Sequence, residues 1–427
     1  MNSSLITKNI SVEQLCIGLY VHLDVGWLNH SFARNSFKIK SDKQISAIKQ
    51  LGLKTVRVEP ARSDCRPLPV SQHPAEPVEA IEPSPEELEL IHAKRARIEK
   101  LVAESSAIAQ CEKEFEKAAN TLKNISRNLF SRPQEAQREA DQLIQQMLES
   151  LLADKDIAIH LMNDKIAGEE AYYHSLNVSV LAMMLAKELH LSEPDIKMIG
   201  VACLFHDIGK IEIPDRIVNK TFALTKAEQN LLQQHCQYGV VIAEKLGLPK
   251  QVIDIIQQHH EYADGSGYPN RLTSGQMSPL ARIVSVVNAY DNHCNRPNPA
   301  DSLTPYEALA FMFKQQRKLF EPAALDMFIH CLGVYPPGTI VQLSDATLGM
   351  VMSINSGKPL RPSVLIYDPE IPKNEAIILD LSKETDLEVA ASLRPKQLAP
   401  EVYEYLSPRK RMSYFMDTQR TGNKIRS

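Results

Sequence analysis

The feature that most constrains this chain is a group of histidines within one stretch of about 90 residues. They fall on successive segments with helical periodicity, and acidic residues adjoin most of them: His174, His206, His235, His259 and His260. Polar rings that are buried together must be paired or bound to an ion. The pattern therefore favours one metal site, built where several helices converge, over a set of independent structural histidines.

Carboxylates accompany the first two of these histidines. Glu170 and His174 are four residues apart, so a helix places both on one face, where two side chains can grip one ion. Taken alone, such a pair is more often a solvated surface pair. In LFHDIGK, His206 and Asp207 end an apolar helical run, and Lys210 adds a cation one turn later. Two polar groups at the end of a buried segment favour metal binding.

The remaining histidines come from two further segments. His235 lies in LLQQHCQYG on an amphipathic helix, where a lone histidine is more often a core or surface residue than a ligand. His259 and His260 end the next helix, in HHEYADGSGYP. Neighbouring helical residues point about 100° apart, so these two either serve two metals or one of them supports the other. Imidazole and carboxylate without thiolate favour Fe, Mn or Zn, and two close ions suit attack at phosphorus.

The rest of the chain divides into parts of different pattern. Residues 1–60 predict a small α/β domain, in which strand-like LYVHLDV and KTVRVEP flank a helix over SDKQISAIKQLG. Residues 61–84 predict a proline-rich linker. Residues 85–154 predict long connecting helices, which either form a hairpin or dimerising signalling helix or pack on their own domain. Residues 155–400 predict helices followed by a short β appendage, and 401–427 a basic disordered tail.

Composition excludes several classes of protein. The formal net charge of −4 excludes the global basic field that holds a nucleic acid polymer by counterion release. The 7 cysteines are scattered without a C-x-x-C pair, which favours free thiols in a reducing compartment. The N-terminal residues do not form a signal-peptide pattern, and no apolar run is long enough for a membrane span. We therefore expect a cytoplasmic protein.

The motifs HDIGK and HHEYADGSGYP together resemble the HD-GYP family, a branch of the HD-domain metal-dependent phosphohydrolases. HSLNV, LFHDIGKIEIP, NKTFALTKAE, HCQYG and ARIVSVV follow the family order and spacing over roughly residues 165–350. QLCIGLYVHLDVGWLNHSF resembles the small domain of unknown function often fused ahead of HD-GYP. The resemblance implies a mainly α fold, with an HD-type helical bundle, a small N-terminal α/β domain and a short C-terminal β appendage.

The resemblance also implies an activity. Family members hydrolyse cyclic dinucleotides with two or three divalent metals, usually iron or manganese. Cyclic di-GMP is their usual substrate, which they cut to pGpG and often on to GMP. We therefore expect a bacterial second-messenger phosphodiesterase. The GYP loop is linked to partner recognition in the family, so a signalling protein is an expected partner at this loop, and a homodimer is compatible with the long helices.

Carried over motif by motif, the resemblance implies roles for individual residues. The implied metal ligands, among which His206 and Asp207 bridge the metal core, are Glu170, His174, His206, Asp207, His235, His259, His260 and Asn288. The implied catalytic residues are His206, Asp207 and Lys210. Asp207 orients the attacking water or takes its proton, and Lys210 holds a substrate phosphate. The implied substrate-side residues are Lys210, Asp264, Gly267, Tyr268, Pro269 and Arg296.

One departure from the family pattern bears on metal binding. The family has a metal-binding Asp at the position of Asn288, and an amide brings no negative charge. This loss predicts weaker metal binding and a less acidic bridging water. Asp291 matches a second family Asp, for which we expect a structural role rather than compensation for the lost ligand. Arg296 retains the family's anion-contacting arginine, in a segment that is one residue shorter.

Two alternatives to cyclic di-GMP hydrolysis stay open. Because of Asn288, the chain can act as a sensor or adaptor that binds a cyclic dinucleotide or a partner protein with little or no turnover. Alternatively, it is an enzyme of the same class that prefers 3′,3′-cyclic GMP–AMP, since the sequence offers no pattern that reads guanine. Metal content and hydrolysis in Mn²⁺ or Fe²⁺ separate the adaptor from the enzyme.

Overall fold

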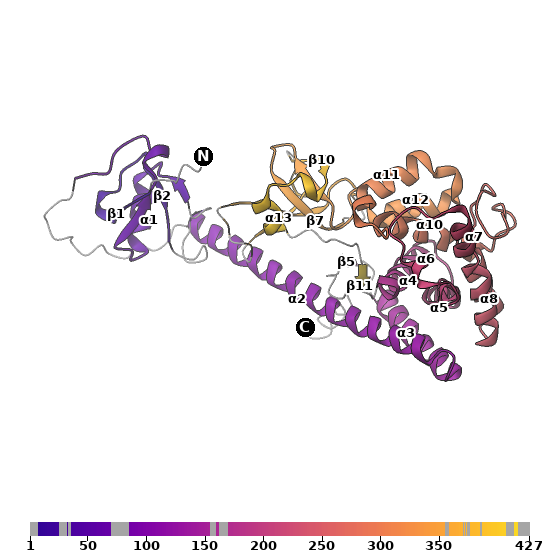
Figure 1. The fold of residues 1–427 in the computed structure, drawn as a ribbon. Helices are drawn as coiled ribbons and strands as arrows, with labels where there is room; N and C mark the ends of the chain where they lie inside the picture. The colour runs from indigo at the N-terminus through magenta and orange to yellow at the C-terminus, as the bar shows by residue number, and fades with distance from the viewer. Residues whose placement is uncertain are drawn as a thin grey trace. The chain divides into compact units, whose positions relative to one another are not determined.

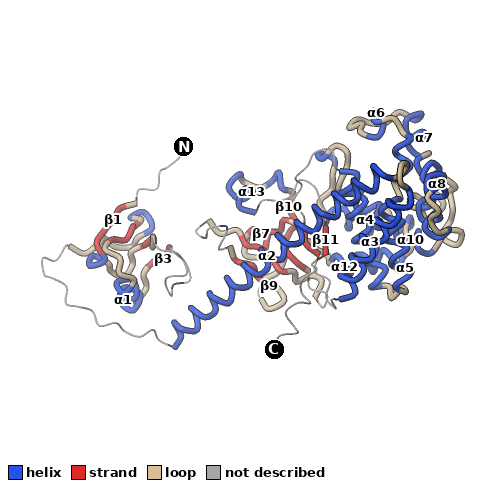
Figure 2. The backbone as a smooth tube through the Cα atoms, turned by 90° about the horizontal axis from the view of Figure 1, so that it is seen from below, coloured by secondary structure: helices blue, strands red, loops and turns tan. Residues whose placement is uncertain are grey.

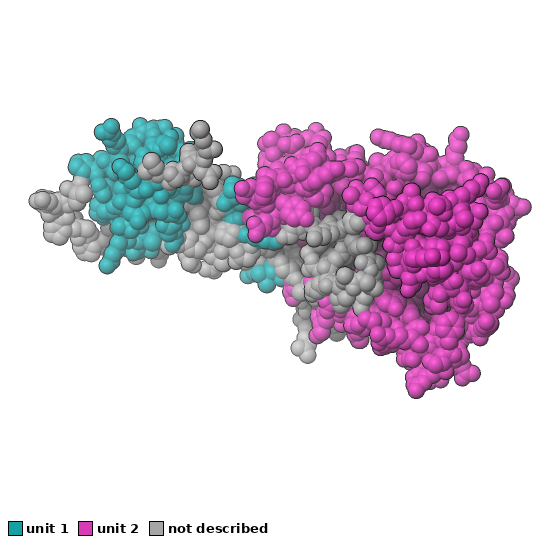
Figure 3. Space-filling view, in the orientation of Figure 1, with its two compact units in different colours: residues 1–103, 367–377 teal, residues 104–366, 378–427 magenta. Residues whose placement is uncertain are grey.

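The computed structural model describes residues 7–24, 32, 36–69, 85–153, 159–161, 170–354, 358–369, 371, 373, 376–384, 387–406 and 414–416. The chain divides into two compact units, residues 1–103 with 367–377 and residues 104–366 with 378–427 (Figure 3). Each unit is described by itself. A search of the described helices finds none whose length and hydrophobicity would let it span a membrane.

Residues 8–62 of the first unit form a four-stranded antiparallel sheet with one α-helix (Figure 1). Its elements are β1 (Lys8–Ser11), η1 (Val12–Gln14), β2 (Tyr20–His22), β3 (Ser36–Lys38), α1 (Asp42–Gln50), β4 (Thr55–Val58) and η3 (Pro60–Arg62). The strand order is β1-β4-β2-β3. Leu19, Val21 and Ile48 are fully buried in its core. Gly52 follows α1 with a φ of 70°, which glycine adopts without strain. The predicted α/β domain is confirmed.

Two long helices follow the proline-rich segment, most of which lies outside the described residues. They are α2 (Pro85–Asn128) and α3 (Pro133–Ala153), and the later part of α2 belongs to the second unit. Phe115, Ile125 and Ile144 from these helices are buried in the same hydrophobic core as the helices that follow. From residue 104 onward, α2 and α3 therefore pack on their own domain. This was one of the two interpretations of residues 85–154, the other being a hairpin or a dimerising signalling helix.

A helical bundle forms most of the second unit (Figure 2). Its elements are α4 (Glu170–Glu188), α5 (Glu193–Phe205), η4 (Ile208–Glu212), α6 (Asp215–Val218), α7 (Lys226–Gln233), α8 (His235–Lys245), α9 (Lys250–Gln258), α10 (Pro279–Cys294), η5 (Pro299–Asp301), α11 (Pro305–Gln315), η6 (Arg317–Leu319) and α12 (Pro322–Leu332). α5 packs against α4 and α9, α10 packs against α4, and α8 packs against η4 and α9. The bundle confirms the predicted mainly α, HD-type fold.

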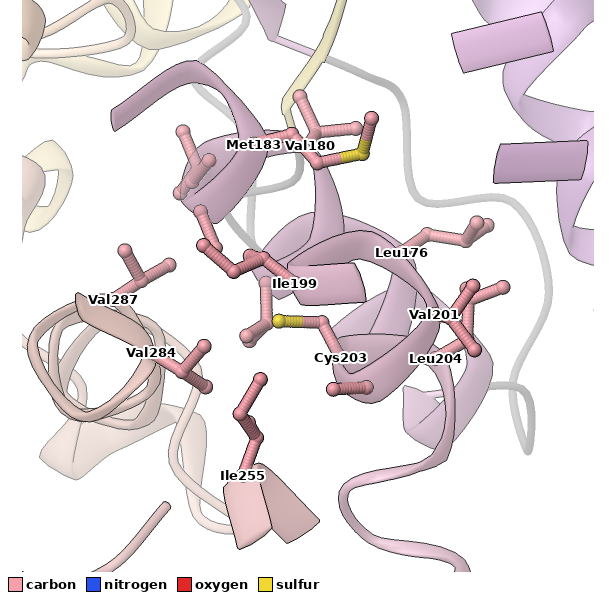
Figure 4. Close-up of a cluster of buried hydrophobic side chains, with 14 of the residues drawn as sticks. Leu176, Val180, Met183, Ile199, Val201, Cys203, Leu204, Ile255, Val284 and Val287 are labelled. Carbon is pink, nitrogen blue, oxygen red and sulfur yellow. The ribbon is translucent and has the colours of Figure 1, made fainter. Parts of the chain in front are cut away.

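Helix α5 explains how the bundle positions polar residues. Ser192 caps its start by accepting the backbone N–H of Asp195, and every residue from 199 to 205 is buried. In Figure 4, the side chains of α5 meet those of three neighbouring helices: Leu176, Val180 and Met183 from α4, Ile255 from α9, and Val284 and Val287 from α10. Since each buried side chain of this size contributes roughly 1.5–3 kcal/mol, this layer fixes the end of α5, where His206 follows.

The C-terminal part of the second unit carries a five-stranded sheet. Its elements are β6 (Ile340–Leu343), β7 (Leu348–Ser353), β8 (Ser363–Ile366), β9 (Ile377–Asp380) and β10 (Val389–Leu393), followed by η8 (Pro395–Gln397). The strand order is β10-β6-β7-β8-β9. Val341, Val351 and Val364 are fully buried in its core. The predicted β appendage is confirmed.

The prediction of a disordered tail over 401–427 is wrong for two segments. Residues 400–406 form helix α13 (Pro400–Leu406), in which Val402 and Leu406 are buried. Strand β11 (Tyr414–Met416) pairs antiparallel with β5 (Ile159–Leu161). Short apolar runs within a basic tail can satisfy their backbone groups by pairing with another strand, which tail composition does not reveal. The rest of the tail lies outside the described residues.

Candidate metal centre

His206 and Asp207 lie where α5 ends and η4 begins. His206 is the C-cap of α5, and Asp207 is the residue before η4. The His206 side chain is 0% exposed and that of Asp207 is 14% exposed. Gly209, in η4, approaches α8 so closely that an added Cβ would collide with the carbonyl oxygen of His235. This close packing, which requires glycine, sets the Asp207 carboxylate beside His235.

Imidazole rings approach Asp207 on both carboxylate oxygens. Nε2 of His174 and Nε2 of His206 each lie 3.5 Å from Oδ2 of Asp207. Nε2 of His235 lies 3.3 Å and Nε2 of His259 lies 3.7 Å from Oδ1. The ligand atoms form two groups able to hold an ion, one of His174, His206 and Asp207 and one of Asp207, His235, His259 and His260. Asp207 belongs to both groups, as a carboxylate that bridges two ions would.

Hydrogen bonds determine which nitrogen of each ring faces this centre. Three rings place Nδ1 against a carbonyl oxygen three residues earlier: His206 with Cys203 (2.7 Å), His235 with Leu232 (2.6 Å) and His259 with Ile256 (2.7 Å). Since a carbonyl only accepts, each Nδ1 carries the proton and each Nε2 keeps a lone pair. For His174, Oδ2 of Asp291 accepts from Nδ1 at 2.5 Å.

These lone pairs face one another. Nε2 of His174 lies 3.1 Å from Nε2 of His206, and the same distance separates Nε2 of His235 from Nε2 of His259. Two acceptor nitrogens this close repel each other unless a cation lies with them. Metal–nitrogen bonds of about 2.1 Å at right angles place two ligand nitrogens about 3 Å apart. The spacing therefore fits two ligands of one ion in each group.

The Asp207 carboxylate supplies an independent indication of a cation. Its Oδ1 is buried and has no hydrogen-bond partner in the part of the chain that the structure describes. Its Oδ2 accepts from Nζ of Lys210 at 2.6 Å. A buried carboxylate oxygen needs a donor or a cation. The residues present thus fit a divalent metal.

Burial holds four of the rings, those of His206, His235, His259 and His260, in the neutral, metal-binding form. It lowers the pKa of His206 to about 4, against the opposing effect of Asp207. Burial also lowers the pKa of His235 and brings the pKa values of His259 and His260 well below their usual range. Although burial opposes its ionisation, the charge of Lys210 helps to hold the pKa of Asp207 well below its usual range. Neutral imidazoles and a carboxylate are the donor set of Fe, Mn and Zn sites.

The two other expected ligands belong to α4 and α10. Glu170 begins α4, one turn before His174, and its side chain lies outside what the structure describes. Asn288 is buried on α10, where its Oδ1 accepts from Nδ2 of Asn292 at 3.0 Å. Its carbonyl oxygen is therefore already engaged by a neighbour on the same helix.

Asp291 positions His174. It is fully buried, and while its Oδ2 accepts from His174, its Oδ1 accepts from the side-chain amides of Asn177 and, at 2.9 Å, Asn295. A carboxylate on Nδ1 fixes the tautomer and raises the basicity of Nε2. This contact agrees with the expected structural role of Asp291. Sequence reasoning missed the part of Asn177, although its spacing of three from His174 places both on one helical face.

A buried glutamate shapes the loop after His260, and sequence reasoning missed this role. Glu261 is 0% exposed, and its carboxylate accepts the backbone N–H groups of Asn270 at 2.6 Å and Leu272 at 2.9 Å. Buried charge is tolerated when such hydrogen bonds replace water. The loop is therefore closed back onto the residue that follows His260.

Gly267 and Tyr268 complete this loop. A Cβ on Gly267 would collide with the Tyr262 nitrogen and the His260 carbonyl oxygen, so only glycine fits. Tyr268 then stacks on His260, with ring centres 4.5 Å apart, and a cis peptide bond joins it to Pro269. The loop thus brings an aromatic ring into direct contact with the second histidine group.

Two other expected substrate-side residues make local contacts. Oδ1 of Asp264 accepts from the N–H and the hydroxyl of Ser266, at 2.9 and 2.6 Å, which shapes the loop. A guanidinium nitrogen of Arg296 lies 3.4 Å from Nδ1 of His293, and its backbone N–H donates to Ser302 at 3.0 Å. By contrast, Lys210 and Tyr268 contact the histidine groups directly.

Comparison with known proteins divides the chain into three consecutive matches. Residues 7–140 match a domain of unknown function (DUF3391), residues 146–324 match an HD domain, and residues 340–401 match a KOW domain associated with HD domain. The three matches follow the order in which the N-terminal unit, the helical bundle and the C-terminal sheet occur in the chain.

Individual proteins are also similar to this chain. A cyclic di-GMP phosphodiesterase of Pseudomonas aeruginosa is 28% identical over 370 residues, which cover 84% of this chain and 85% of that protein. A 3′3′-cGAMP-specific phosphodiesterase of Vibrio cholerae is 31% identical over 178 residues, 41% of this chain and 34% of that protein. Among solved structures, an HDG"Y"P protein from Bdellovibrio bacteriovorus has a TM-score of 0.41 at 15% identity and covers 76% of this chain and 98% of its own.

Proposed function

The chain belongs to the HD-GYP family of HD-domain phosphohydrolases, and from this premise we propose that it hydrolyses the phosphodiester bonds of a cyclic dinucleotide. We propose that cyclic di-GMP, the nucleotide in the name of the Pseudomonas relative, is among its substrates and is cut to pGpG or on to GMP. The observation that carries the proposal is the pair of histidine groups that share Asp207. Seven scattered cysteines without a C-x-x-C pair fit a reducing, cytoplasmic compartment.

The proposed metal ligands fall into the two groups around Asp207. His174 and His206 would hold one ion, and His235, His259 and His260 would hold another, with Asp207 common to both. Glu170 would extend the first group from the preceding turn of α4. The nitrogen and carboxylate donors favour iron or manganese, as two or three divalent ions. Bound there, such ions supply an activated water and neutralise charge on the phosphoryl oxygens.

Lys210 and Asp207 have complementary roles in this proposal. The Lys210 side chain is 33% exposed, so its ammonium can leave the carboxylate and meet a phosphoryl oxygen of the substrate. It thereby stabilises charge that grows in the transition state. Asp207 stays ionised, because its pKa is held well below its usual range. It therefore accepts a hydrogen bond from the attacking water and orients it, rather than keeping the proton.

A second candidate function is binding of a cyclic dinucleotide with little or no turnover. Asn288 favours it, because an uncharged side chain whose carbonyl oxygen is engaged by Asn292 stands where the family has a metal-binding Asp. A centre that lacks this charge binds its ions more weakly. The two candidates differ in metal content and in product, so one experiment separates them.

The experiment compares metal-reconstituted wild type with the His206→Ala/Asp207→Ala double variant. We expect stoichiometric metal by elemental analysis and hydrolysis of cyclic di-GMP in Mn²⁺ or Fe²⁺ for the wild type, and loss of both in the variant. His330→Ala, which removes an exposed histidine of α12, is the matched control. Wild-type turnover by the double variant would refute the assignment. Tight nucleotide binding without product in the wild type would favour the second candidate.

A further inference from the structure

A pocket of about 370 Å³ lies beside the histidine groups. Five residues line it: Leu224, Gln229, Leu232, Gln233 and Tyr268. Three of them belong to α7, one precedes α7, and Tyr268 belongs to the loop after His260. Nothing in the proposed chemistry at Asp207 uses the four residues from α7 and its approach.

The pocket shares two of its walls with the candidate metal centre. Tyr268 stacks on His260 with ring centres 4.5 Å apart, and it stands edge-on to His235 at 6.3 Å. The carbonyl oxygen of Leu232 accepts from Nδ1 of His235 at 2.6 Å. A substrate with a phosphate at the histidine groups can therefore place its adjoining part in the pocket.

The size and lining of the pocket suit a single nucleobase with its sugar. Its volume is at the low end of the roughly 300–1,000 Å³ of small-molecule sites, so it holds one nucleoside rather than a whole cyclic dinucleotide. Leu224 and Leu232 are apolar, and Tyr268 is an aromatic ring on which a base can stack.

Two carboxamides give the pocket its hydrogen-bonding character. Gln229 and Gln233 are four residues apart on α7, so both lie on one helical face. Each carboxamide presents a donor and an acceptor side by side, which can bond two atoms on the edge of a base. The five lining residues include neither a cation nor a carboxylate.

The two carboxamides bear on which purine the pocket favours. At the base edge that faces the DNA major groove, arginine or lysine reads guanine through O6 and N7, whereas asparagine or glutamine reads adenine through N6 and N7. We propose that the pocket is a nucleobase subsite in which Gln229 and Gln233 favour adenine. The substrate it selects is a cyclic dinucleotide with at least one adenine, such as 3′,3′-cyclic GMP–AMP, over cyclic di-GMP. The inference rests on the proposed phosphodiesterase function.

The test compares the wild type with the Gln229→Leu/Gln233→Leu double variant on two nucleotides, 3′,3′-cyclic GMP–AMP and cyclic di-GMP. Bis(p-nitrophenyl) phosphate, a diester without a base, reports the metal centre of each variant, and the nucleotide rates are taken relative to it. We expect the wild type to prefer the adenine-containing nucleotide in kcat/KM by about tenfold or more, the value of one bidentate base contact. The double variant should lose most of this preference.

Asn230→Leu is the matched control, since it removes an exposed carboxamide of α7 that is not among the lining residues; it should keep the preference. Equal kcat/KM values for both nucleotides in the wild type, or a preference that the double variant retains, would overturn the subsite. If the metal-loaded wild type hydrolyses none of the three diesters, the proposed function fails instead. Calorimetric binding of both nucleotides to the wild type and the double variant then decides the subsite by the same ratio.

Discussion

Two histidine–carboxylate clusters in this chain differ in what satisfies the imidazole nitrogens. In the first unit, His22 has a partner on each nitrogen: Nδ1 lies 2.7 Å from Oγ of Ser36, and Nε2 lies 3.3 Å from Oε2 of Glu59. In the candidate metal centre, the Nδ1 atoms of four rings are likewise bonded, but their Nε2 lone pairs converge on each other and on Asp207. A closed network needs no ion, whereas converging acceptors do. The free nitrogen, rather than the presence of a histidine near a carboxylate, marks a metal site.

The largest effect should come from removing Asp207, the carboxylate that both histidine groups of the candidate metal centre share. We expect Asp207→Ala to lose metal from both groups and to lower kcat by at least about 10³-fold, because it deletes the shared ligand and a group that orients water. Glu59→Ala removes the buried carboxylate of the closed cluster and should leave metal content unchanged. Elemental analysis and steady-state kinetics measure both. Full metal content in Asp207→Ala would break the distinction between the clusters.

A smaller effect should follow from loosening one ring without deleting a ligand. Asp291→Asn keeps the size of the side chain but removes the charge that faces Nδ1 of His174. We expect metal affinity to fall by about 10–100-fold, the usual cost of losing a partner of a ligating histidine. Titration with a metal-sensitive dye measures the affinity. Rescue of activity at high Mn²⁺ would separate this positioning role from a loss of folding, and unchanged affinity would show that His174 needs no such support.

The sequence predicted the convergence of the histidines, because helical periodicity and the carboxylate spacings depend only on local geometry. It did not predict how His259 and His260 share one group. Adjacent helical residues diverge by about 100°, but α9 ends at Gln258 and His259 is its C-cap, so the rings follow the turn instead. A sequence pattern does not determine the last residue of a helix to within one position.

The sequence also did not predict the contacts that hold the loop and the histidine rings of the site in place. Glu261 lies within the motif HHEYADGSGYP, yet its role depends on the backbone N–H groups of Asn270 and Leu272, which come within hydrogen-bond distance only once the loop is folded. The carbonyl oxygens that orient the rings carry no side-chain identity at all. Such contacts are set by tertiary packing, which composition and spacing do not encode.

Acid should lower the free energy of unfolding of the metal-free protein, because the buried ring of His206 binds a proton less readily than the same ring in the unfolded chain. Burial holds the pKa of His206 at about 4, below its ordinary value of 6.5. Between these values, the unfolded chain binds a proton that the folded centre does not, so the stability of the metal-free protein should fall as pH drops from 6.5 to 4. The metal-loaded protein should release its ions below about pH 4, where the buried ring of His206 protonates in the folded protein. Thermal unfolding at several pH values measures this, and stability that rises on acidification would contradict it.

The smallest expected effect concerns Asn288, a buried side chain of α10 whose Oδ1 accepts from Asn292. In Asn288→Asp, a carboxylate replaces a side chain that is 2% exposed. Without metal, a buried charge that has only the Asn292 amide as its partner destabilises the fold. With metal, the same charge lies where the family holds an ion, so metal affinity and turnover should rise, by up to about tenfold. The variant should therefore melt below the wild type in chelator and above it in Mn²⁺.

This opposite response to metal is the informative outcome, because a merely structural change would shift both melting temperatures the same way. Asn230→Asp is the matched control, since it adds the same charge at an exposed position of α7. It should leave the difference between the chelator and Mn²⁺ melts close to that of the wild type, since water already solvates its charge. If Asn288→Asp behaves as this control does, then Asn288, like His22, is satisfied by local hydrogen bonds and takes no part in metal binding. The ions then need only the ligands around Asp207.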